Sequence, residues 1–262
     1  MLVGFISNIH EDIVCLKLAL QILTDSKCSA VVCLGDLVGY SVPHFRFLAS
    51  RDSHAVIELV SATCATVVAG NHDLYAIRKT PQLQRIFDYP PNWYALDYHV
   101  RKARSKGDIW LYEENELSAL LTASDKAYLA SLPEYAVCTF DGVRVFVSHY
   151  AYPDLTGDSR KGRPFASSAI SEHFSLMIEH DCRLAVSGHA LAEGVQIFTE
   201  SMANQYPFGV YKLPDERVWI SGPAVANGTS RNGVVIFNTA TMEISAIPIG
   251  APTHTIPEWS NR

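Results

Sequence analysis

Short apolar runs alternate with amphipathic stretches over the first third of the chain. Three runs of strand length lie at Met1–Ser7, Ala30–Leu34 and Cys64–Ala69. Helices are predicted between them, one from its N-cap at Asp12 to about Thr24 and one around Ser53–Ser61. Alternating strands and helices are typical of βαβ units with a parallel sheet. Because such a sheet is covered on both faces, its strands are apolar throughout, as these runs are.

The rest of the chain predicts an insertion and then a second set of strands. Residues 74–132 are rich in aromatic side chains and are interrupted at Pro90-Pro91, so we expect a helical insertion over the sheet. A hairpin with a tight Asp141-Gly142 turn follows, then a helix at Ala166–Glu179 and short strands whose turns suit an antiparallel sheet. We therefore expect a single domain over residues 1–262, with two packed sheets flanked by helices.

Composition limits the classes of function. Apolar residues make up 48% of the 262 residues, which is enough for a sizeable core and excludes disorder of the whole chain. The formal net charge is −6, so no global field attracts nucleic acid. Only 18% of residues are charged, and this low fraction favours a homodimer.

Location is predicted from what the chain lacks. The first residues carry no basic leader and no cleavage site of small residues, so we expect no signal peptide. No apolar run approaches the roughly 18 residues that a membrane span needs. The six cysteines are scattered and form no C-x-x-C pair, which favours buried thiols in a reducing, cytoplasmic compartment.

Polar side chains that can bind metals follow several of the predicted strands. They are Asn8 and His10 after the first, Asp36 after the second, Asn71, His72 and Asp73 after the third, His149 after the hairpin, and His189 after a later strand. In α/β sheets, ligands bind outside the carboxyl ends of the strands. We expect these groups to converge on one point. No G-x-S-x-G, Walker A or G-x-G-x-x-G motif competes with this interpretation.

The order and spacing of these groups resemble the calcineurin-like metallophosphoesterases, which carry D-x-H, G-D, G-N-H-[DE], a lone His and G-H-x-H. The matching segments are Asn8-Ile9-His10, Gly35-Asp36-Leu37-Val38-Gly39-Tyr40, Gly70-Asn71-His72-Asp73, His149 and Gly188-His189-Ala190-Leu191. The resemblance covers nearly the whole chain. It implies a four-layer α/β/β/α sandwich of two mixed sheets, with metals at the strand ends and hydrolysis of a phosphomonoester or phosphodiester.

The resemblance also implies roles for these residues. One metal would take Asp36, Asn71, His149 and His189, and the other would take Asp36, His10 and positions 8 and 191. His72 would donate to the phosphate or leaving group, oriented by Asp73. Two cations about 3.5–4 Å apart clamp the attacking and leaving oxygens of an in-line displacement. A set of imidazole, carboxylate and amide ligands suits Mn, Fe, Zn or Ni.

Two positions of the second metal site depart from the family pattern. Position 8 is Asn rather than Asp and position 191 is Leu rather than His, so this site is weakened. Three acidic residues lie near the damaged positions. We expect Asp12 to cap a helix and Glu11 to lie at the surface, while Glu193 is the candidate that would reach inward.

Three interpretations therefore stay open. The first is a hydrolase with one strong metal site, and the second is an enzyme that uses one metal for other chemistry. The third is a former enzyme that has lost its activity and binds a phosphate-containing ligand or a partner. Arg160 and Arg163 lie in the loop after His149 and are candidates for binding an anionic small-molecule substrate. The aromatic side chains of the insertion suit its own core, a dimer face or stacking on a ring of the substrate.

Overall fold

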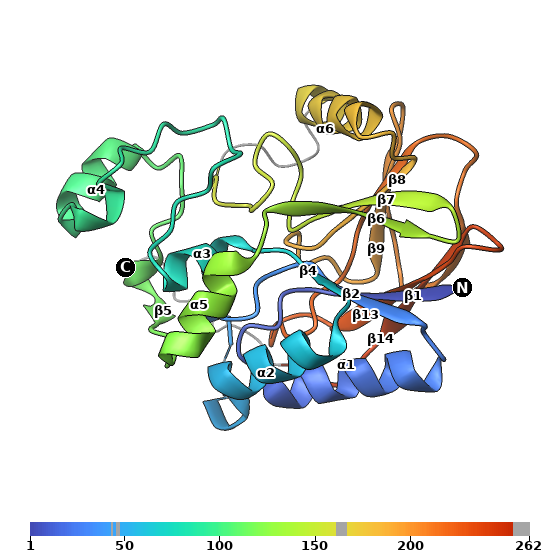
Figure 1. Ribbon diagram of the computed structural model, residues 1–262, viewed down its shortest axis with the longest axis horizontal. Helices are drawn as coiled ribbons and strands as arrows, with labels where there is room; N and C mark the ends of the chain where they lie inside the picture. The colour runs from blue at the N-terminus through green and yellow to red at the C-terminus, as the bar shows by residue number, and fades with distance from the viewer. Residues whose placement is uncertain (43, 46–47, 161–166, 254–262) are drawn as a thin grey trace.

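The computed structural model describes residues 1–42, 44–45, 48–160 and 167–253, with no side chains described for residues 167–169. It contains two six-stranded sheets that face each other (Figure 1). Helices α1 and α2 cover the outer face of one sheet, and α6 covers the outer face of the other. The expected four-layer sandwich of two mixed sheets is confirmed.

The first sheet has the order β11-β14-β13-β1-β2-β4. Its strands are β1 (Leu2–Ile6), β2 (Ala30–Cys33), β4 (Thr66–Val67), β11 (Gly209–Lys212), β13 (Gly233–Asn238) and β14 (Glu243–Pro248). Strands β1, β2 and β4 run parallel, as the βαβ pattern predicts, and β13 joins β1 antiparallel. Helices α1 (Ile13–Asp25) and α2 (Ser53–Thr63) make the two crossovers between the parallel strands.

The second sheet has the order β10-β9-β12-β8-β7-β6. Its strands are β6 (Tyr135–Phe140), β7 (Val143–Ser148), β8 (Leu184–Ser187), β9 (Val195–Phe198), β10 (Ala203–Tyr206) and β12 (Val218–Ser221). Its hairpins are antiparallel, as the turns suggest, but the sheet is mixed because β8 pairs parallel to both β7 and β12. Helix α6 (Ser167–Glu179) lies between β7 and β8 in the chain and supplies the crossover that parallel neighbours need.

Three apolar layers hold the four layers of structure together. Between the sheets, Phe5 and Val32 of the first pack with Val147 of the second. Beneath the first sheet, α1 and α2 bury their apolar faces against it. Above the second sheet, Phe174 of α6 packs in one cluster with Trp219. This rigid sandwich fixes the strand ends from which the polar groups project.

The insertion is less helical than its sequence suggests. Within the described part of residues 74–132, the regular elements are short: the end of α3 (Asn71–Ala76), η2 (Trp93–Ala95), α4 (Tyr98–Ser105), η3 (Tyr112–Glu114), β5 (Glu116–Leu117) and α5 (Ala123–Ser131). In its irregular part, the rings of Phe87 and Tyr89 pack edge-on against the buried Trp93. Strand β5 pairs with β3 (Tyr40–Ser41), a contact that the sequence does not predict.

Two further expectations concern the membrane and the cysteines. Among the described helices, none combines the length and apolar character required to cross a bilayer. All six cysteines are free thiols, and Cys15, Cys33 and Cys182 are buried. The residues from 254 onward lie outside the described part of the chain.

Candidate metal centre

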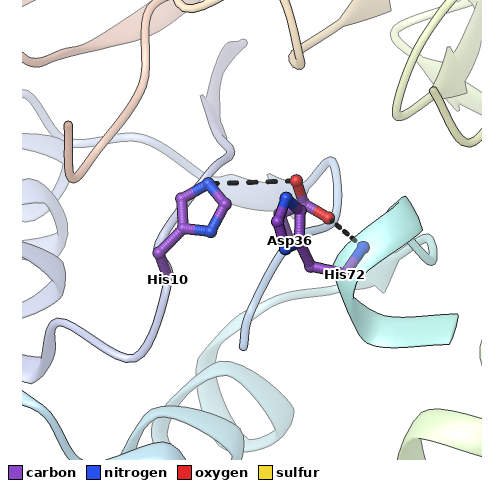
Figure 2. Close-up of side chains that lie close together, drawn as sticks. All are labelled: His10, Asp36 and His72. Atoms are coloured by element: carbon purple, nitrogen blue, oxygen red, sulfur yellow. Dashed lines mark hydrogen bonds and ion pairs between the residues drawn. The ribbon is translucent and has the colours of Figure 1, made fainter. Parts of the chain in front are cut away.

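The carboxylate of Asp36 lies at the centre of the converging polar groups. Its Oδ2 is 3.0 Å from Nε2 of His149 and 3.9 Å from Nε2 of His10. Its Oδ1 accepts a hydrogen bond from the backbone N–H of His72 at 3.0 Å. Figure 2 shows His10 and His72 next to this carboxylate. The strand ends named in the sequence therefore meet at one carboxylate, which is only 1% exposed.

The backbone around Asp36 is shaped for this placement. Asp36 has a φ of +57° and follows Gly35 at +93°, so the chain turns sharply as it leaves β2. A Cβ at Gly70 would lie 2.1 Å from Oδ1 of Asp36, so a side chain there would collide with the carboxylate. The glycine before Asn71 thus permits the close approach of the two loops that carry Asp36 and Asn71.

The carboxylate of Asp73 holds these loops together. It accepts hydrogen bonds from the backbone N–H groups of Asp36 at 2.8 Å, Leu37 at 2.9 Å, Val38 at 3.2 Å and Gly70 at 3.0 Å. The expectation that Asp73 orients the His72 side chain therefore needs correction. The carboxylate is occupied by backbone donors because α3 begins at Asn71 and places Asp73 in its first turn, facing the loop.

The histidines present the nitrogen that a metal needs. Nδ1 of His149 donates to the carbonyl oxygen of Leu34 at 2.6 Å, and Nδ1 of His10 donates to that of Gly39 at 2.8 Å. A carbonyl oxygen only accepts, so Nδ1 carries the proton in both rings and the lone pair is on Nε2. Fixing the tautomer through the far nitrogen is the usual outer-shell arrangement of metal-binding histidines.

Asn71 contributes a buried oxygen without a partner. Its Nδ2 donates to the hydroxyl of Tyr112 at 2.8 Å, while its Oδ1 has no hydrogen-bond partner among the described residues. A buried polar atom left unpaired is costly, so it indicates a group that the chain itself does not supply. The oxygen of an amide is a suitable ligand for a divalent cation.

His189 completes this group of ligands. Its Nδ1 lies 3.2 Å from Nε2 of His149, with a backbone φ of +61°. Ligand atoms of Asp36, His149 and His189 all lie within 4.8 Å of one another. A second group with the same spacing consists of His10, Asp36 and His72, so that Asp36 belongs to both. Together with the free oxygen of Asn71, these residues fit a divalent cation between Asp36, His149 and His189.

The charges of two histidines agree with that fit, whereas at His149 the charge of Asp36 outweighs burial and raises the pKa. Burial lowers the pKa of His10 to about 3, helped by the nearby His72, and burial with His149 lowers the pKa of His189 to about 3. Both rings are therefore neutral at pH 7, as metal ligands must be. Burial alone would raise the pKa of Asp36, but His149 and His72 outweigh it and hold this carboxyl ionised.

His72 has a partner that sequence reasoning missed. Its Nδ1 lies 2.5 Å from Oε2 of Glu116, whose side chain is 3% exposed. Burial lowers the pKa of His72, but the charges of Glu116 and Asp36 outweigh it and raise the pKa to about 9. Glu116 is 44 residues away in the chain. The pairing of β5 with β3 brings Glu116 to His72, and no local sequence motif predicts that pairing.

The two substituted positions of the second site offer no charged ligand atom. Nδ2 of Asn8 donates to Oγ of Ser7 at 3.0 Å, and Leu191 offers no ligand atom. The three acidic residues nearby are engaged elsewhere. Asp12 caps α1 as expected, and the exposed Glu193 accepts from the backbone of Arg231 instead of reaching inward.

Glu11 is not at the surface, so that expectation is wrong. It is 1% exposed, accepts from the Gly39 backbone at 3.1 Å and pairs with Nε of Arg51 at 2.6 Å. The guanidinium pairs with its charge, which explains how a carboxylate next to His10 is buried.

The two arginines expected to bind substrate have different outcomes. Arg160 is exposed, with its guanidinium 4.7 Å from the centre of the Trp110 ring. It stands two residues after Asp158, whose carboxylate is bonded to the Tyr112 hydroxyl beside Asn71. Arg163 lies outside the described residues.

Two mixed sheets between helices, with a carboxylate, an amide and histidines gathered at the strand ends, define the metallophosphoesterase class. A model of the calcineurin-like phosphoesterase superfamily domain matches residues 1–191. The chain belongs to this family.

Solved structures agree on the fold. A metallophosphoesterase from Sphaerobacter thermophilus is 20% identical, with a TM-score of 0.66 over 95% of this chain and 88% of that one. A hypothetical protein from Pyrococcus horikoshii is 14% identical, with a TM-score of 0.57 over 95% of this chain and 87% of that one. None of the curated proteins matches this sequence. At these identities the likeness shows the fold alone.

Proposed function

We propose that the chain is a metal-dependent hydrolase of a phosphomonoester or phosphodiester, with one strong metal site. The observation that carries the proposal is the convergence of ligand atoms of Asp36, His149 and His189, and the buried, unpaired Oδ1 of Asn71 supports it. These four residues would hold a divalent cation. His10 and Asn8, with Asp36, would form a weaker second site. Mn, Fe, Zn or Ni suits the strong site, since its ligands are imidazole, carboxylate and amide.

A cation bound there polarises the phosphoryl oxygens and lowers the pKa of bound water. The chain's own contribution is proton transfer and orientation. Glu116 accepts a hydrogen bond from Nδ1 of His72, so Nε2–H on the other side of the ring points away from Glu116. This Nε2–H donates to a phosphate oxygen or a leaving group. Asp73 acts one step further away by fixing the backbone that carries Asp36. Arg160 at the rim attracts the anionic substrate.

The test is hydrolysis of two chromogenic substrates, p-nitrophenyl phosphate and bis-p-nitrophenyl phosphate, by protein loaded with Mn²⁺. We expect His72→Ala to lower kcat by about 100-fold or more while metal content stays near the wild-type value. His189→Ala should instead lose the metal, as measured by elemental analysis. Equal turnover in His72→Ala and wild type would contradict the role of His72, and a metal-free wild type would contradict the whole proposal.

A second candidate is a catalytically impaired protein that binds a phosphate-containing ligand or a partner. It is favoured by the second site, where the Asn8 amide is bonded to Ser7 and Leu191 has no ligand atom. The double variant Asn8→Asp, Leu191→His separates the two candidates. If two metals are needed for turnover, the wild type is inactive and the double variant gains both a second metal equivalent and activity. If one metal suffices, the wild type is active without it.

Other features of the chain stay predictions from its sequence. These are a cytoplasmic location, a homodimer and the use of Mn in particular. Size-exclusion chromatography with light scattering tests the dimer directly.

A further inference from the structure

A chain of hydrogen bonds leads from Asn71 into the insertion. Nδ2 of Asn71 donates to the Tyr112 hydroxyl at 2.8 Å, and this hydroxyl donates to Oδ1 of Asp158 at 2.7 Å. The other oxygen of Asp158 accepts from the hydroxyl of Tyr89. Asn71, Tyr112 and Asp158 are each less than 8% exposed. The chain therefore joins a candidate metal ligand to two phenols of the insertion through buried polar groups.

The direction of these bonds fixes the orientation of the Asn71 amide. The Tyr112 hydroxyl donates its single proton to Oδ1 of Asp158, whose Oδ2 accepts that of Tyr89. It can then only accept from Asn71, which turns the amide NH₂ toward Tyr112. The unpaired Oδ1 is consequently the atom left for the metal. If the Tyr112 hydroxyl were removed, the Asn71 amide would lose the acceptor that fixes its NH₂, and its oxygen would no longer be held toward the metal site.

Asp158 is itself held by a tight loop, residues 150–160, which we call the bracing loop. The buried carboxylate of Asp154 accepts from the backbone N–H groups of Gly157, Asp158 and Ser159 at 3.1, 3.1 and 2.7 Å. Gly157 packs so closely on His189 that a Cβ there would lie 2.4 Å from its Nδ1. The bracing loop thus supports two candidate ligands, His189 directly and Asn71 through Tyr112.

Backbone bonds dock the insertion on the same loop. The N–H of Trp110 donates to the carbonyl oxygen of Asp158 at 3.0 Å, and the N–H of Arg160 donates to that of Asp108 at 2.8 Å. The insertion contacts the bracing loop here through residues 108–112, while α4 lies further out at the periphery of the molecule (Figure 1). Docking of the insertion therefore places the Tyr112 hydroxyl on Asn71.

We propose that docking of the insertion and metal binding at the strong site are coupled, with Tyr112 and Asp158 as positioning residues for Asn71. The docked insertion raises metal affinity by orienting Oδ1 of Asn71. Because such coupling is reciprocal, the bound metal holds the insertion on the bracing loop by the same factor. This inference rests on the metal site of the proposed function, but not on the reaction performed there.

The first experiment measures the affinity for Mn²⁺ alone, by electron paramagnetic resonance of the free ion. Loss of an outer-shell partner of a metal ligand typically weakens binding 10- to 100-fold, and we expect this loss for Tyr112→Phe. Tyr98→Phe is the matched control, because it removes a phenol of the same insertion that is bonded to Glu114. Affinities of Tyr112→Phe and wild type that agree within about twofold would overturn the proposal.

The second experiment needs no variant. Hydrogen exchange is followed in the wild type with and without saturating Mn²⁺, in segments 108–112 and 158–160. We expect exchange there to slow by at least about tenfold, matching the affinity lost in Tyr112→Phe, while β11 and β14 are unaffected. In Tyr112→Phe the slowing should largely disappear.

The outcomes separate this inference from the proposed function. If Mn²⁺ binds and His72→Ala loses turnover, but exchange rates in these segments are the same with and without Mn²⁺, the coupling is wrong and the proposed hydrolase function is supported. If the insertion is protected by Mn²⁺ but no phosphoester is hydrolysed, the coupling stands and the hydrolase is wrong. A wild type that binds no Mn²⁺ overturns both.

Discussion

At the scale of single residues, the environment of His72 is what distinguishes a proton donor from a metal ligand. Glu116 accepts from one nitrogen of the ring, and its charge, with that of Asp36, raises the pKa to about 9 despite burial. His10, with a carbonyl oxygen in the equivalent place, has its pKa lowered to about 3. Two neighbouring histidines thus differ in charge at pH 7 because burial dominates at His10, whereas the added charge of Glu116 outweighs burial at His72.

Replacing Glu116 by Gln should move the alkaline limit of activity to lower pH. The amide keeps the size of the side chain but removes the charge, so the pKa of His72 falls toward its ordinary value of about 6.5. Because His72 donates only when protonated, kcat/KM for bis-p-nitrophenyl phosphate should decline at least about one pH unit earlier than in wild type. Glu114→Gln, which removes an exposed carboxylate bonded to Lys102, is the control and should leave the profile in place. An unshifted profile in Glu116→Gln would contradict the pairing.

At the scale of elements, the loops after β2 and before α3 matter more than the strands themselves. A single carboxylate, Asp73, accepts four backbone N–H groups from the two loops. Burial and the charge of Asp36 raise the pKa of this carboxyl to about 7, and in its charged form each such bond contributes a net ~1.5–3 kcal/mol. The geometry of Asp36 therefore depends on an element that begins 35 residues after it in the chain.

The substitution Asp73→Asn tests this dependence. Its amide NH₂ would face backbone donors instead of accepting from them, so we expect about 2–4 kcal/mol of unfolding free energy to be lost, measured by urea denaturation. Mn²⁺ affinity should fall with it, since Asp36 and Asn71 lose their common support. Asp52→Asn is the matched control: Asp52 caps α2 from outside the core, and Asn caps helices as well as Asp does. Similar losses in both variants would contradict the special role of Asp73.

The sequence predicts these elements unevenly, for physical reasons. The cap at Asp12 and the helical spacing of apolar residues predict helix α1. Runs of apolar residues predict the buried strands of both sheets. Strands β3 and β5 have only two residues each, so no period exists to detect. The same limit hides the partner of His72. Asp36, Asn71 and His149 lie within a few residues of strand ends, so their convergence was predictable. Glu116, by contrast, is brought to the site by the long-range pairing of β5 with β3.

At the scale of the whole molecule, stability comes from three apolar layers, and one of them contains a titratable group. His173 on α6 is fully buried beside Phe146 and Trp219, with ring centroids 5.7 and 4.9 Å away. Its Nδ1 accepts from the backbone N–H of Tyr152 at 3.1 Å, and its Nε2 has no hydrogen-bond partner among the described residues. Burial lowers the pKa of His173 to about 3.

This histidine should make the sandwich sensitive to mild acid. The unfolded chain takes up the proton near pH 6.5 and the folded chain only near pH 3, so the stabilisation is complete above pH 6.5 and declines as pH falls. At about 1.4 kcal/mol per pH unit, wild type should lose about 2 kcal/mol more than His173→Gln between pH 7 and pH 5. Urea denaturation of metal-free protein at both values measures this difference, since the metal-binding histidines are common to both proteins. His54→Gln is the control of opposite sign, because a hydrogen bond from exposed His54 to Asp125 raises its pKa, so wild type should gain stability relative to that variant in acid. A parallel acid dependence of wild type and His173→Gln would show that the α6 layer opens before His173 is protonated.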